Sequence, residues 1–286
     1  MDNYLNQELS HTIDVFVCRN KELSDMRYKL AADAKPQVTL LLAATGVSVA
    51  LWFIAWYVPI VGYVVYPLQL FATFVHEGSH ALMTLLTGNH VASLTVSPDT
   101  SGVVWSQAPW FSSLLISSAG YLGATAFGTL LLVWVRYGFS SRLALYISAG
   151  FVGIMTFVFG FLSPFWNLLA NVTFLSVVFT VVSGSVLSVG LFAVAKFAKD
   201  KWVNFALAFL AVQCLLNAFF SLKDLFFISA GTNQTTDAAN MAAATGVPAL
   251  LWVVLWIGIS LVMITVGLRL YAVGKGAVLG DSVFED

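Results

Sequence analysis

Long apolar runs, separated by short polar segments, make up most of this sequence. Each run has about the 20 residues that an α-helix needs to cross the hydrocarbon core of a bilayer. The first run covers residues 37–57, and the second covers 59–87 and ends at Gly88-Asn89. Five more runs cover residues 110–135, 143–162, 168–197, 202–229 and 248–271. The pattern predicts an all-α polytopic membrane protein with six to seven transmembrane helices.

Residues 90–107, directly after the second run, follow a different pattern. Val91, Leu94 and Val96 precede a turn-forming stretch, Ser97 to Gly102, and Val103-Val104-Trp105 follows it. Short apolar runs on either side of such a turn are typical of a hairpin. We therefore expect a short β-hairpin over 91–105.

The polar residues outside these runs gather at the two ends of the chain. Residues 1–36 mix basic and acidic residues and lack a continuous apolar core, so they do not resemble a cleavable signal peptide. We expect a cytosolic polar arm at 1–36, one integral membrane domain at 37–273 and a polar tail at 274–286. Cys18 and Cys214 lie far apart in sequence, and we interpret both as free thiols.

The composition supports this class and excludes another. Hydrophobic residues make up 59% and charged residues 9% of the chain, against about 25% charged residues in soluble proteins. The lipid bilayer is therefore the expected surrounding. The net charge is -1 and no basic stripe occurs, which argues against nucleic-acid binding.

Basic residues indicate the orientation in the membrane. They cluster in the N-terminal arm, at Arg136 and Arg142, at 196–201, and at Arg269 and Lys275, while 88–109, 163–168 and 230–247 contain none. The positive-inside rule then places both termini in the cytosol. The sequons at Asn171 and Asn233 agree with that orientation. Seven crossings would break this charge pattern, so we expect six clean crossings, with 59–87 a re-entrant or tilted segment.

An H-E-x-x-H motif, His76-Glu77-Gly78-Ser79-His80, lies within the second apolar run. On a helix the two histidines share one face and can bind a single zinc ion, and the glutamate can act as a base toward water. A charged residue inside a membrane costs about 2.5 to 3.5 kcal/mol on insertion scales, which favours a functional role. A satisfied polar cluster in a helix bundle is the alternative.

A catalytic zinc usually has a third protein ligand, and several residues are candidates. No glutamate lies between Glu77 and Glu285, so the third ligand of thermolysin-type enzymes has no counterpart. The candidates and their structural alternatives are Asp237 (a helix N-cap), Asp224 (a pair with Lys223), Asp99 (an Asx turn), His90 (a surface or capping residue) and Asp200 (a loop residue). We interpret Gly120, Gly123 and Gly128 as sites of close helix packing.

Several motifs together resemble the short branch of the site-2 protease family of intramembrane zinc metallopeptidases, which lacks a PDZ domain. They are His76-Glu77-Gly78-Ser79-His80-Ala81-Leu82, Leu94 to Gly102, Ser118 to Gly123, and Thr236 to Ala242 with Thr245-Gly246-Val247-Pro248. The resemblance implies that His76 and His80 bind zinc, that Glu77 is the catalytic base, and that an aspartate from a later helix is the third ligand. That role falls to Asp237, with Asp224 in reserve, although neither lies in the family's Asn-Pro-Asp-Gly or Leu-Asp-Gly setting.

The resemblance implies hydrolysis of peptide bonds in or near transmembrane segments of membrane proteins. A substrate helix must unwind first, and an exposed edge of the hairpin at 91–105 could hold it as an added strand. A plain surface hairpin is the alternative. The competing functions are a catalytically inactive scaffold of the same fold and a metal ion transporter using Gln213, Asn217 and Asp224.

Overall fold

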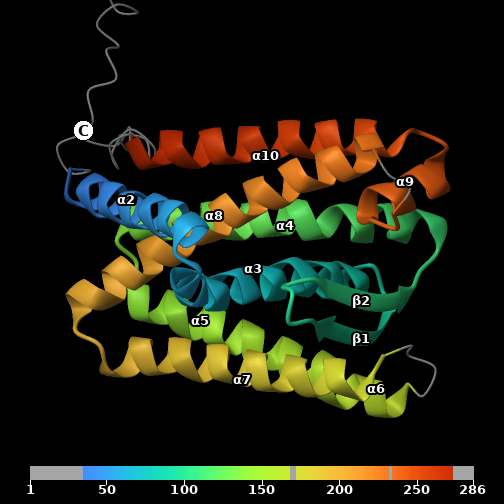
Figure 1. Ribbon diagram of the computed structural model, residues 1–286, viewed down its shortest axis with the longest axis horizontal. Coiled ribbons are helices and arrows are strands. Elements are labelled where there is room, and N and C mark those ends of the chain that lie inside the picture. The colour runs from blue at the N-terminus through green and yellow to red at the C-terminus, as the bar shows by residue number, and fades with distance from the viewer. Residues whose placement is uncertain (1–34, 168–171, 232–233, 273–286) are drawn as a thin grey trace, which may run out of the picture. The chain divides into compact units, whose positions relative to one another are not determined.

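Seven helices of the described chain are long and apolar enough to cross a membrane. The computed structural model describes residues 35–167, 172–231 and 234–272. The helices are α2 (Lys35–Tyr57), α3 (Pro59–Leu86), α4 (Trp110–Tyr137), α5 (Ser141–Ile154), which continues through a π-helical segment η2 (Met155–Leu162) into α6 (Ser163–Trp166), α7 (Phe174–Phe197), α8 (Asp200–Gly231) and α10 (Ala249–Ala272), with a short α9 (Asp237–Thr245) between the last two (Figure 1). The predicted all-α polytopic membrane class is confirmed.

Most predicted spans match the observed helices within a few residues. The largest difference is at α7, which begins at Phe174 and not at residue 168. The Thr173 side chain accepts a hydrogen bond from the Ser176 amide and so caps this helix. The cytosolic arm at 1–36 and the tail at 274–286 fall almost wholly outside the described residues, as do Cys18 and the sequon residues Asn171 and Asn233.

The helix α3 is continuous over its 28 residues. A re-entrant segment has to reverse direction, so this alternative for residues 59–87 is wrong, whereas a tilted helix is consistent with the structure. Pro67 lies inside α3, where its ring removes one backbone hydrogen bond. Residues 36–271 together form one compact unit, with α3 packed against α4, α5, α7 and α8.

The predicted hairpin is confirmed, with β1 (His90–Val96) and β2 (Gly102–Gln107) paired antiparallel. Two hydrogen bonds hold its tip against α3. The Tyr66 hydroxyl donates to the Pro98 carbonyl and the Thr73 hydroxyl donates to the Thr100 carbonyl, each at a distance of 2.7 Å. Thr100 has a positive φ of 67°, which is unusual for a β-branched residue. The hairpin therefore lies along α3 in a fixed position.

The first and last described helices reach the same end of the helix bundle. The Tyr271 hydroxyl in α10 donates to the Gln37 carbonyl in α2 at a distance of 2.6 Å. Arg136 Nε at the end of α4 donates to the Tyr271 carbonyl at a distance of 2.8 Å. At the start of α5, Arg142 forms an ion pair of 2.6 Å with Asp200 at the start of α8. Figure 1 shows this end on the left and the hairpin, α6 and α9 at the other end.

Candidate metal centre

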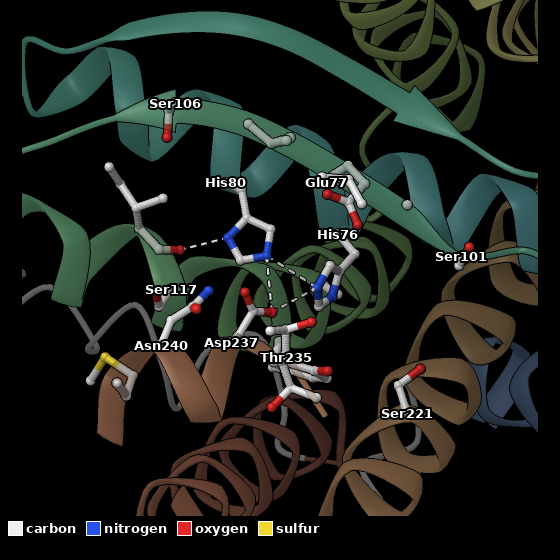
Figure 2. Close-up of a pocket in the computed structure, with 18 of the residues that line it drawn as sticks. His76, Glu77, His80, Ser101, Ser106, Ser117, Ser221, Thr235, Asp237 and Asn240 are labelled. Carbon is white, nitrogen blue, oxygen red and sulfur yellow. Dashed lines mark hydrogen bonds and ion pairs between the residues drawn. The ribbon is translucent and has the colours of Figure 1, made fainter. Parts of the chain in front are cut away.

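Two histidines and an aspartate from distant parts of the chain meet in one cluster. His76 and His80 lie one turn apart on α3, and Asp237 lies in the first turn of α9 (Figure 2). Asp237 Oδ2 lies 3.5 Å from His76 Nε2 and 3.3 Å from His80 Nε2, and the two Nε2 atoms are 3.1 Å apart. Ligands bonded to zinc at about 2.0–2.1 Å in a tetrahedron are about 3.3 Å from one another. The cluster thus has the spacing of three zinc ligands.

The position of Asp237 depends on the residue before it. Thr236 is the N-cap of α9, and its hydroxyl accepts a hydrogen bond of 3.1 Å from the Ala239 amide. The N-cap alternative for Asp237 is therefore wrong, and its carboxylate is free to point at the histidines. Burial works to raise the pKa of the Asp237 carboxyl, but the charges and hydrogen bonds of the two imidazoles outweigh it and lower that pKa below its ordinary value.

The other candidate ligands lie outside this cluster. Asp224 is 63% exposed and forms an ion pair of 2.9 Å with Lys223, which matches its structural alternative. Asp99 Oδ1 accepts hydrogen bonds from the amide and hydroxyl of Ser101, as the predicted Asx turn requires, and these bonds lower the pKa of the Asp99 carboxyl. The exposed ring of His90 lies beside Asn167, and Asp200 pairs with a cation as described above.

The two histidine rings are held by different means. His80 Nδ1 lies 2.6 Å from the Ile116 carbonyl of α4, so that nitrogen carries the proton and donates, which leaves the Nε2 lone pair free for a metal. The His76 ring meets the Tyr121 ring edge to face, at 4.5 Å between centroids and 84° between planes. Tyr121 in turn stacks on Trp256, which is only 1% exposed. The Tyr121 and Trp256 rings therefore orient the His76 side chain.

Two glycines allow the backbone to approach the site, and their role here is a correction to the sequence analysis. A Cβ at Gly120 would lie 2.6 Å from His76 Cε1 and still closer to the Nε2 atoms of both histidines. At Gly102, the first residue of β2, it would lie 2.6 Å from Glu77 Oε1. Gly120 thus faces the cluster of His76, His80 and Asp237 and is more than a helix-packing position. Gly123 and Gly128 pack against side chains of α3 and α8, as predicted.

The cluster opens into a cavity of about 1080 Å³. Its walls come from α3, β2, the first half of α4, α8 and α9. Glu77 is 5% exposed and projects toward the cavity beside His76, whereas Asn240 lies on the far side of the ligand cluster from it (Figure 2). Asn240, Asn217 and Tyr121 were not predicted to line this cavity, because only the fold brings α9, α8 and α4 to the motif.

One of three comparisons with known proteins found a match. No curated protein and no solved structure matches the chain. The sequence model of one family, described as Peptidase M50B-like, matches residues 43–267, which is more than half of the chain and includes every element of the cluster. The chain therefore belongs to the Peptidase M50B-like family, and the predicted membership of the site-2 protease family is confirmed.

Proposed function

We propose that this protein is an intramembrane zinc metalloprotease that hydrolyses peptide bonds in or near transmembrane segments of membrane proteins. One observation carries the proposal. Three ligand atoms, from His76, His80 and Asp237, converge with zinc spacing beside the buried carboxylate of Glu77, at the wall of an open cavity. Membership of a peptidase family supports the same conclusion.

The residues present fit zinc and divide the chemistry among themselves. Two imidazoles and a carboxylate are a common ligand set of catalytic zinc, which polarises the scissile carbonyl and makes water a nucleophile near pH 7. The Glu77 carboxylate takes a proton from the attacking water and delivers it to the leaving nitrogen. The Ile116 carbonyl and the Tyr121 ring keep His80 and His76 in the orientation that these steps need.

The strand β2 is the part of the cavity wall best suited to hold an extended substrate. The outer edge of β1 is covered, because Thr180 Oγ1 accepts from the Val96 amide and side chains of Ser163 and Asn167 donate to the β1 backbone. The outer edge of β2 pairs with no other strand of the described residues, and residues 102–106 line the cavity. An extended substrate can therefore add to β2 by backbone hydrogen bonds.

The orientation that we propose places both termini in the cytosol. Gln37 and Tyr271 are in contact, so the chain between them crosses the membrane an even number of times. Seven separate crossings would be an odd number, so we infer that α2 and α3, which follow one another directly along the chain, together make one crossing of six. Arg136, Arg142 and the 196–201 group lie at that same end, and basic residues favour the cytosolic side.

The competing functions have less support. A transport path needs free polar groups across the membrane, but the Asp224 carboxylate is paired with Lys223 at an exposed position. An inactive scaffold has no need of a buried carboxylate at Glu77, where burial without function costs free energy.

Zinc content and proteolysis test the proposal together. Purified wild type in detergent should hold one zinc per chain, Asp237→Asn should lose it, and Asp224→Asn, the matched control, should keep it. Glu77→Gln should keep zinc but fail to cleave an unfolded casein or a library of single-span fusion proteins. Zinc in neither wild type nor control, or undiminished cleavage by Glu77→Gln, would overturn the proposal.

A further inference from the structure

The ring of Tyr121 is held between two other rings beside the metal cluster. It meets the His76 ring edge to face, and it stacks on the Trp256 ring at 5.5 Å between centroids and 19° between planes. Trp256 is itself fixed, because its indole nitrogen donates a hydrogen bond of 3.2 Å to the Ser118 hydroxyl of α4. The Tyr121 side chain is therefore rigid and lies next to a metal-binding histidine.

The Tyr121 hydroxyl takes no part in this packing. Among the described residues it forms no hydrogen bond, and it is not one of the polar atoms that lack both a partner and access to solvent. Tyr121 lines the cavity, so its hydroxyl is accessible from there. A phenylalanine ring could make the same contacts with His76 and Trp256. A polar group that packing does not need, within a membrane-spanning helix, favours a functional role.

Peptide hydrolysis needs a hydrogen-bond donor of this kind. As water adds to the scissile carbonyl, the carbonyl oxygen becomes negatively charged, and donors that are already in position stabilise that charge. No lysine or arginine of the described residues lines the cavity, so a neutral side chain has to contribute the donor. Asn240 also lines the cavity, but it is exposed, and its side chain forms no hydrogen bond within the described part of the chain. Tyr121 is better preorganised, because two rings fix it.

We propose that Tyr121 is a further catalytic residue, whose hydroxyl donates a hydrogen bond to the carbonyl oxygen of the scissile peptide bond as that oxygen becomes negatively charged. This inference rests on the proposed function. One side chain then has two separate tasks, since the ring orients His76 and the hydroxyl acts on the substrate. The hydroxyl keeps its proton throughout, so Tyr121 transfers no atom. The hydrogen bond strengthens in the transition state, and it therefore raises kcat more than it lowers KM.

Tyr121→Phe separates the two tasks, because it keeps the ring and removes only the hydroxyl. Tyr146→Phe is the matched control, since Tyr146 is also half-buried, its ring contacts Phe192, and it lies outside the cavity lining. Zinc content is measured by mass spectrometry, and cleavage of one single-span fusion protein is measured over a range of its concentration. We expect Tyr121→Phe to keep one zinc per chain and an almost unchanged KM, with kcat lowered by about 100-fold, as for the loss of one oxyanion donor. Tyr146→Phe should match wild type in all three quantities.

Binding of a phosphinic peptide gives a readout that does not depend on turnover. Its phosphinate group is tetrahedral and negatively charged, like the carbonyl after water has added, and such analogues report on binding of the transition state. Tyr121→Phe should bind this peptide about 100-fold more weakly than wild type or Tyr146→Phe does.

Three results would overturn the catalytic role of Tyr121. A Tyr121→Phe protein that keeps its zinc, cleaves as fast as wild type and binds the phosphinic peptide equally well would refute this role and leave the proposed function intact. Loss of zinc from Tyr121→Phe would show that the hydroxyl only supports the metal cluster. A wild type that neither holds zinc nor cleaves would refute the proposed function, and the role of Tyr121 with it.

Discussion

Gly120 offers the sharpest test of the metal centre, because a single methyl group there would occupy the space of the ligands. In Gly120→Ala the added carbon would lie 2.6 Å from His76 Cε1, whereas ordinary contacts are 3.4 Å or longer. The His76 ring would have to retreat by at least about 0.8 Å, the difference between those two distances, because its Nε2 atom would lie closer still. Ligand distances in metal sites tolerate only about 0.2 Å. We therefore expect zinc affinity to fall by at least about 100-fold, or about 2.7 kcal/mol.

The assay is zinc binding by purified protein in detergent, dialysed against graded free zinc set by a chelator and measured by mass spectrometry. Circular dichroism on the same samples establishes that the helices remain folded. Gly150→Ala is the matched control, because it also adds a methyl group to a helical glycine. Apart from the chain neighbours and the backbone of its own helix, no atom lies within 4 Å of the added carbon, so this variant should bind zinc as wild type does. A folded Gly120→Ala protein with zinc affinity within about threefold of wild type would refute the reasoning.

Three further predictions concern the surroundings of the site. Gly102→Ala should displace the Glu77 carboxylate, which lies 2.6 Å from the added carbon, and should lower the rate of peptide cleavage by about 100-fold while zinc content stays unchanged; loss of zinc would contradict this. Tyr121→Leu should weaken zinc binding by a few-fold to about tenfold, because the edge-to-face contact with His76 is lost, and Tyr121→Phe, which keeps the ring, should not. Asp99 has a lowered pKa, so its carboxylate adds stability above about pH 4 that is lost as the pH falls through the folded-state pKa. The difference in melting temperature between wild type and Asp99→Asn should therefore be larger at pH 7 than at pH 3, and a difference independent of pH would contradict this assignment.

The choice between aspartates shows where sequence reasoning reached its limit. The spacing of His76 and His80 follows from the helical repeat, so two ligands could be predicted from local sequence. Asp237 and Asp224 both remained candidates for the third ligand, because each lies far from His76 and His80 in the sequence. Packing decided between them, since Thr236 caps α9 and leaves the Asp237 carboxylate free to meet the histidines.

The sequence by itself determined the membrane class, the approximate spans, the hairpin and the H-E-x-x-H pair. These features depend on the local composition, the thickness of the bilayer and the helical repeat, so a short stretch of sequence is enough to predict them. The tertiary structure alone decided that α3 is unbroken, that Gly120 and Gly102 touch the histidines and the glutamate, and that the cavity lies near one end of the bundle. Those features depend on close contacts between residues distant in the chain, and side-chain packing fixes such contacts only when the helices have assembled.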